Sequence, residues 1–148
     1  MCAASGNAIS IVAIAGVLAL QPKVMIFDEP TAGLGPRGRR ELLALVETLR
    51  QRHSMTIIYI SSSLDDVIEI ADVIHILNQG KLAFSGTPRE ILAHADELAT
   101  MDIALPEAAH IALSLRDIMP DIRTDVLNLD ELEHEIVHIQ ATALRKSL

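Results

Sequence analysis

The first sixty residues alternate between uncharged apolar runs and one amphipathic stretch. Residues 8–20 carry no charge and predict a buried helix, because the run is shorter than the ~20 apolar residues that span a bilayer. Residues 24–27 and 56–61 show no apolar–polar alternation, which predicts strands buried on both faces. Residues 37–52 predict an amphipathic helix with one apolar face: Leu42, Leu45, Val46 and Leu49. Helices alternating with strands in this way predict parallel strands and an α/β fold.

The uncharged run at 8–20 also resembles the core of a secretory signal peptide. No Lys or Arg precedes Lys23 to supply the positively charged region that such a peptide needs. We therefore favour the buried helix, and a signal peptide or membrane anchor is the alternative.

The rest of the chain predicts a hairpin between helical segments. Residues 73–85 predict two strands joined by a turn at Asn78-Gln79-Gly80, and Thr87 is the expected cap of a helix with Pro88 at its first position. The other ranges that predict helices are 64–71, 88–99, 106–116 and 129–144. The composition turns acidic after residue 96, so we divide the chain into a core at 1–86 and a helical extension at 87–148.

Composition and charge exclude several classes of partner and site. The net charge of −8 argues against binding to nucleic acid or to an anionic membrane surface. The single cysteine, Cys2, cannot form an internal disulfide, which indicates a reducing compartment such as the cytosol.

Two carboxylates, Asp28 and Glu29, directly follow the first predicted strand. Ligands of α/β sheets bind at the carboxyl ends of the strands. An apolar strand ending in Asp is the Walker B arrangement, in which the Asp holds Mg²⁺ and a following acid acts on the attacking water. The stretch "DEPTAGL" is far more specific than an isolated pair of acids.

Three stretches resemble one family. "VMIFDEPTAGLGPRGRRELLALVETLR" resembles the Walker B and D-loop region of ABC-transporter ATPases, and "GKLAFSGTPREILAHADEL" resembles the strand and helix that follow it. The tail "LPEAAHIALSLRDIMPDI…LNLDELEHEI" resembles the C-terminal extension of the energy-coupling-factor (ECF) type. The resemblance implies the C-terminal part of a P-loop NTPase core, with a hairpin and a small helical extension.

The resemblance also implies a role for each matching position. Asp28 would coordinate Mg²⁺ and Glu29 would be the catalytic base. Ser5 and Gly6, within "ASGNA", would belong to the signature that binds the nucleotide of the opposite subunit, and Ser62 would stand at the switch histidine. The implied cofactor is Mg-ATP.

The sequence departs from the family pattern at the same functional positions. The D-loop acid is replaced by Gly35, the switch histidine by Ser62, and the signature is degenerate. Serine has no pKa near neutrality and cannot stand in for imidazole. The family's phosphate-binding loop would lie about a hundred residues before the signature, and the stretch from Gly33 to Arg40 matches only the glycine spacing of such a loop. We therefore expect weak or absent Mg-ATP binding by this chain alone.

The sequence "HEIVH" at 134–138 matches the zinc motif H-E-x-x-H. On a helix, His134 and His138 would share a face, with Glu135 as base. The apolar stripe of the same segment favours a packing helix instead, with Leu129, Leu132, Ile136, Ile139 and Ala143 as its members. We expect adventitious zinc binding at most. The stripe would pack on its own domain or pair with a partner helix.

The sequence therefore predicts a truncated, degenerate ATP-binding subunit of an ECF-type ABC transporter. Its ancestral function would be to couple ATP hydrolysis to the uptake of a vitamin or metal ion. The implied partners are a second ATPase subunit, a transmembrane coupling protein and a substrate-binding membrane component, with the chain peripheral to the cytoplasmic membrane. Two alternatives remain: a non-catalytic module that regulates an intact subunit, and a decayed gene fragment.

Overall fold

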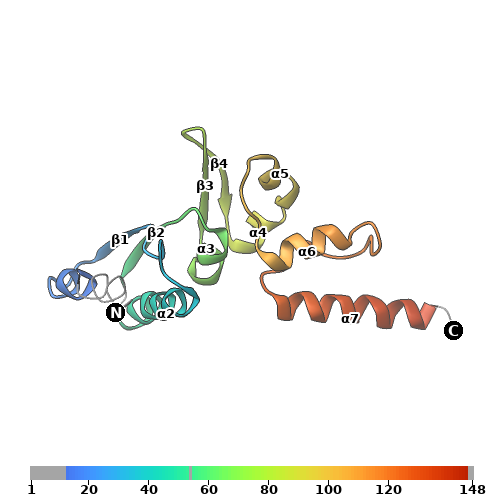
Figure 1. The fold of residues 1–148 in the computed structure, drawn as a ribbon, viewed down its shortest axis with the longest axis horizontal. Helices are drawn as coiled ribbons and strands as arrows, with labels where there is room; N and C mark the ends of the chain where they lie inside the picture. Colours follow the sequence, from blue (N-terminus) through green and yellow to red (C-terminus); the bar gives the residue numbers. More distant parts are fainter. Residues whose placement is uncertain (1–12, 54, 147–148) are drawn as a thin grey trace, which may run out of the picture. The chain divides into compact units, whose positions relative to one another are not determined.

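A computed structural model describes residues 13–53 and 55–146. The chain divides into two compact units, Met1–Ser62 and Ser63–Leu148, whose elements are labelled in Figure 1. The domain boundary predicted after residue 86 stays a prediction. Compactness instead groups the hairpin with the helices that follow it.

The first unit contains a strand–helix–strand motif with parallel strands, as the sequence predicts. Strand β1 spans Val24–Asp28, helix α2 spans Pro36–His53 and strand β2 spans Thr56–Ile60. The two strands pair in parallel, from Val24 opposite Thr56 to Asp28 opposite Ile60. Because parallel strands need a crossover connection, α2 carries the chain back to the start of the second strand.

The prediction that both strands are buried on both faces is wrong for the described residues. Met25 and Phe27 on one face of β1 are 5% and 6% exposed, whereas Ile26 on the other face is 62% exposed. The buried face is completed by side chains of α2: Leu42, Leu43, Val46 and Leu49. Figure 1 shows α2 running beside the strand pair. Helix α2 therefore covers one side only, and burial alternates along β1.

The apolar run at 8–20 is only partly described. Residues 13–18 are helical, as predicted, but the predicted burial is wrong for them. Val17 is half exposed and Leu20, just beyond the helix, is more so. An apolar helix stays exposed when no described segment covers its surface.

The second unit begins with helix α3, Leu64–Ile70, and the predicted hairpin. Strands β3, Ile74–Asn78, and β4, Lys81–Gly86, pair antiparallel around a two-residue turn. Gln79 and Gly80 have φ values of 49° and 73°, as a type I′ turn requires. The glycine makes this conformation inexpensive at the second position.

Four further helices follow the hairpin: α4 Pro88–Leu92, α5 Ala95–Thr100, α6 Glu107–Leu115 and α7 Leu129–Lys146. The predicted cap is confirmed, since Thr87 and Glu90 form a reciprocal capping box at the start of α4. The single helix predicted over 88–99 is wrong, because the chain breaks between α4 and α5. At the break His94 stacks on Phe84 of β4, with ring centroids 4.5 Å apart. The break between the two helices thus coincides with a contact between elements that are distant in sequence.

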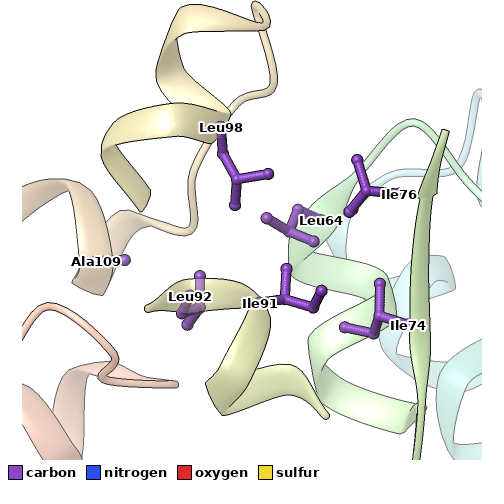
Figure 2. Close-up of a cluster of buried hydrophobic side chains, with 7 residues drawn as sticks. All are labelled: Leu64, Ile74, Ile76, Ile91, Leu92, Leu98 and Ala109. Atoms are coloured by element: carbon purple, nitrogen blue, oxygen red, sulfur yellow. The ribbon is translucent and has the colours of Figure 1, made fainter. Parts of the chain in front are cut away.

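Two apolar clusters form the interior of the second unit. Figure 2 shows the first, which joins α3, β3, α4 and α5 with the start of α6 through Leu64, Ile74, Ile76, Ile91, Leu92, Leu98 and Ala109. The second joins α6 to α7 and includes Leu132, with Ile136 and Ile139 packed against it. The stripe on α7 thus packs on its own unit at these three positions, while Leu129 is half exposed.

Arg89 of α4 forms hydrogen bonds to the loop before α7 and to the first turn of that helix. Its guanidinium donates to the Asp125 carbonyl at 3.1 Å and to both carboxylate oxygens of Glu131 at 3.1 and 3.2 Å. A hydrogen-bonded ion pair with Arg123 lowers the pKa of Asp125, and Arg89 adds to the effect. These bonds join the start of α7 to α4.

None of the helices in the described part of the chain is both long and apolar enough to cross a membrane.

Candidate functional site

The two predicted carboxylates lie at the C-terminal end of β1. Asp28 is the last strand residue and is exposed. Glu29 leaves the strand with a φ of 44°, in the left-handed region that non-glycine residues seldom adopt. Its N–H donates to the carbonyl oxygen of Ile60 at 2.9 Å, so the pairing with β2 extends one residue beyond the strand.

The side chain of Glu29 is also bound to the end of β2. The backbone N–H of Ser62 donates to Glu29 Oε1 at 2.6 Å. Hydrogen bonds to a charged acceptor are short and stronger than neutral ones. Backbone and side-chain bonds together hold the carboxylate between the ends of the two strands, at the edge where α/β sheets bind ligands.

Ser62, which stands at the predicted switch position, therefore binds Glu29 through its main-chain N–H and not through its side chain. The sequence contains no signal for this bond, because any residue except proline supplies the same N–H. Ser63 has a separate role, since its side chain accepts from the N–H of Asp66 and caps α3.

Gly35 lies at the start of α2. Its carbonyl accepts from the N–H of Arg39 at 3.0 Å, which places it at the helix N-cap. A Cβ built on Gly35 meets no atom within 4 Å, and its backbone is outside the positive-φ region. The fold therefore does not require glycine here, and an acidic side chain would be accommodated.

The stretch from Gly33 to Arg40 has Arg39 and Arg40 where a phosphate-binding loop has Lys and Ser or Thr. Helix α2 begins at Pro36, so Gly38 and Arg39 are helical. Ser5 and Gly6, predicted for the signature, lie outside the described residues.

The carboxylates of Asp28 and Glu29 fit a magnesium ion in the chemistry of their oxygen ligands. Mg²⁺ prefers oxygen ligands and is usually held by one or two carboxylates together with waters and phosphate oxygens. Among the described residues no group of three possible metal-binding side chains occurs. The donor set thus suits an ion carried in with a nucleotide better than a permanent metal site.

His134 and His138 lie one turn apart on α7, and both are exposed. No third ligand joins them within the described residues. The arrangement is that of a solvated helix face.

Comparisons with known proteins agree with the fold. The chain is 43% identical over 129 residues to the energy-coupling factor transporter ATP-binding protein EcfA2 of Clostridioides difficile, covering 86% of this chain and 45% of that protein. It is 48% identical over 111 residues to EcfA2 of Latilactobacillus sakei, covering 75% and 38%. The chain is a relative of ECF transporter ATP-binding subunits. It spans about half the length of these relatives or less, and no family model matches it.

Solved structures support the same relationship. The structure of CbiO1 from Clostridium perfringens, part of the ABC transporter complex CbiONQ, matches with a TM-score of 0.54 and 36% identity over 68% of this chain and 40% of that one. A putative metal-chelate type ABC transporter in an inward-facing conformation matches with a TM-score of 0.59 and 28% identity, over 64% and 38%. The fold of this ECF relative is therefore that of an ABC ATPase, an α/β fold of the P-loop NTPase class.

Proposed function

We propose that the chain supplies the Walker B part of an ECF-type ABC ATPase, in degenerate form. The observation that carries the proposal is the Glu29 carboxylate, held by the Ser62 amide at the carboxyl edge of a parallel strand pair. The similarity to ECF ATP-binding proteins supports the assignment to ATP hydrolysis.

In this proposal Asp28 holds Mg²⁺, which neutralises charge on the phosphates when nucleotide is bound. Glu29 would orient a water molecule and accept its proton as the water oxygen attacks the terminal phosphate and the bond from that phosphate to the departing ADP breaks. The Ser62 N–H takes one acceptor site of Oε1 and leaves Oε2 free of this bond. The bond from Ser62 fixes the carboxylate before the water arrives, which lowers the cost of positioning.

The phosphates need a cradle that the described residues do not supply. Phosphoryl transfer depends chiefly on positioning and electrostatics, so Asp28 and Glu29 alone cannot hold a triphosphate productively. We propose that ATP binding requires the part of an ECF ATP-binding chain that this sequence does not match. Binding of Mg-ATP by these 148 residues alone is then weak or absent.

The proposed setting is a membrane transporter. The partners would be a second ATPase subunit, a transmembrane coupling protein and a substrate-binding component at the cytoplasmic membrane. Two relatives support this setting, since CbiO1 belongs to a transporter complex and another match is a metal-chelate type transporter. The ancestral cargo would be a vitamin or metal ion.

The test is a chimera that joins this chain to the unmatched part of C. difficile EcfA2. We expect measurable ATP turnover, and Glu29→Gln should reduce it by ~10²–10⁴, the range for losing a general base. Ser62→Ala keeps the amide and serves as the matched control with turnover near the parent. Turnover that is indifferent to Glu29→Gln would refute the role of this carboxylate.

Gly35 and Ser62 favour a second candidate, a non-catalytic module that binds an intact ATP-binding subunit. Both positions lack the side chains that the family resemblance implies. Co-purification with intact EcfA2 and no ATP turnover attributable to Glu29 would support this candidate.

A further inference from the structure

Two imidazoles lie one turn apart on α7, the last helix in Figure 1. His134 and His138 are four residues apart, and both side chains are exposed. Side chains with this spacing are neighbours on a helix surface, with Cβ atoms about 5–6 Å apart. Two histidines at i and i+4 can therefore bind one metal ion from the same face of a helix.

The packing of α7 holds these two side chains on a fixed face. Leu132 is buried against α6, and Ile136 and Ile139 pack on the same cluster. By the helical repeat these apolar residues lie on the side of α7 opposite to the histidines. Within the described residues neither imidazole is hydrogen-bonded to another group. A metal ion would therefore displace only water from the two rings.

The charges along α7 favour a cation at this position. Asp130 lies one turn before His134, on the same face of the helix. No Lys or Arg occurs in the sequence between Leu129 and Leu144. Since no group of three possible metal ligands forms among the described residues, Asp130 supplies negative charge and not a third bond to the ion.

We propose that His134 and His138 bind a Cu²⁺ ion, with water in its remaining coordination positions. Cu²⁺ has the highest affinity for nitrogen ligands among the divalent first-row metals, and its square-planar geometry accepts two neighbouring imidazoles. Zinc sites in proteins have at least three protein ligands, which the described part of the chain does not supply here. The inference is independent of the proposed function.

A bound ion would also stabilise the second half of α7. Ile139 is the last residue of the helix in the cluster with α6, and residues 140–142 are exposed. An ion bound to two successive turns links them beyond their backbone hydrogen bonds. We therefore expect Cu²⁺ to raise the melting temperature of α7.

The test is a calorimetric titration of copper(II) chloride into the full 148-residue chain. Every protein compared carries Cys2→Ser, because a thiolate is a competing ligand for copper. The matched control combines His138→Gln with Gln140→His, an exchange between two exposed positions that leaves composition and charge unchanged. The exchange puts the two imidazoles on different sides of α7.

The affinity for Cu²⁺ should fall by about tenfold or more in the exchanged protein. In the parent the second imidazole binds intramolecularly, at a high effective concentration, and the exchange removes this advantage. Electron paramagnetic resonance should show two imidazole nitrogens on Cu²⁺ in the parent and at most one in the exchanged protein. His134→Gln alone should give the same loss, which provides a second variant if the exchange disturbs the helix.

Equal affinities of the parent and of both variants would overturn the proposal. A parent spectrum with fewer than two imidazole nitrogens would overturn it as well. Four imidazole nitrogens, together with a copper-dependent dimer in analytical ultracentrifugation, would overturn it in favour of a site shared between two copies of the chain.

Discussion

The two compact units differ in how completely they bury their apolar surface. In the second unit Ile91, Leu92 and Leu98 are almost fully buried, and the cluster draws on α3, the hairpin and several helices. In the first unit the strand pair is covered on one face by α2, and Ile26 stays exposed on the other. The best-buried core and the carboxylates at the end of β1 thus reside in different units of the chain.

Matched isoleucine truncations should show the largest contrast between the units. Ile91→Ala removes a side chain that is 1% exposed and should cost ~2–5 kcal/mol of unfolding free energy, the usual range for such core truncations. Ile26→Ala should cost less than ~1 kcal/mol, because little apolar area leaves a buried environment. Urea unfolding followed by circular dichroism measures both, and equal costs would remove the contrast.

The charged connection in the second unit should give a smaller effect. Arg89→Met keeps an apolar stem but removes the bonds to Glu131 and to the Asp125 carbonyl, and should cost ~1–2 kcal/mol. Arg37→Met in the first unit is the control. The side chains of Arg37 and Glu41 are 88% and 52% exposed, so solvent screens their ion pair and its loss should hardly change the stability. Urea midpoints that shift alike for both variants would contradict a special role for Arg89.

Acid should weaken the second unit through Asp125. Arg123 lowers the pKa of this carboxylate in the folded state, so the unfolded state binds the proton first as the pH falls. The stabilisation is fully present above the unfolded pKa of ~3.9 and is lost as the pH falls through the lower folded value. Asp125→Asn should therefore have a lower free energy of unfolding than the parent at pH 7, and the two free energies should converge in acid. A stability difference that does not shrink with acid would contradict this.

The smallest expected effect belongs to Gly35. Gly35→Asp would place an acceptor at the N-cap of α2 and a negative charge at its positive end, stabilising the fold by a few tenths to ~1 kcal/mol. Gly35→Asn supplies a capping acceptor without the negative charge, so comparing the two variants separates the contribution of the cap from that of the charge. Thermal unfolding of the two variants measures the gain, and a loss of stability would show that the loop needs glycine after all.

The sequence predicted the features that depend on local chemistry. Thr87 with Pro88 located the start of α4, and Gln79-Gly80 located the hairpin turn, because caps and tight turns are set by a few adjacent residues. The place of Asp28 and Glu29 at a strand end followed from the apolar run before them.

The remaining features depend on distant groups. Ile26 and Met25 are equally apolar in sequence, and only the position of α2 decides which one is buried. The break between α4 and α5 accompanies the stacking of His94 on Phe84. The bond from the Ser62 amide to Glu29 involves the main chain, so no residue pattern could indicate it.

The central claim is that Asp28 and Glu29 retain the geometry for hydrolysis while the chain alone does not hold the nucleotide. Calorimetric titration of Mg-ATP into the 148-residue chain tests this most directly. We expect no binding with a Kd below 1 mM, a limit of about −4.1 kcal/mol. Sub-millimolar binding that Asp28→Asn abolishes would contradict the claim.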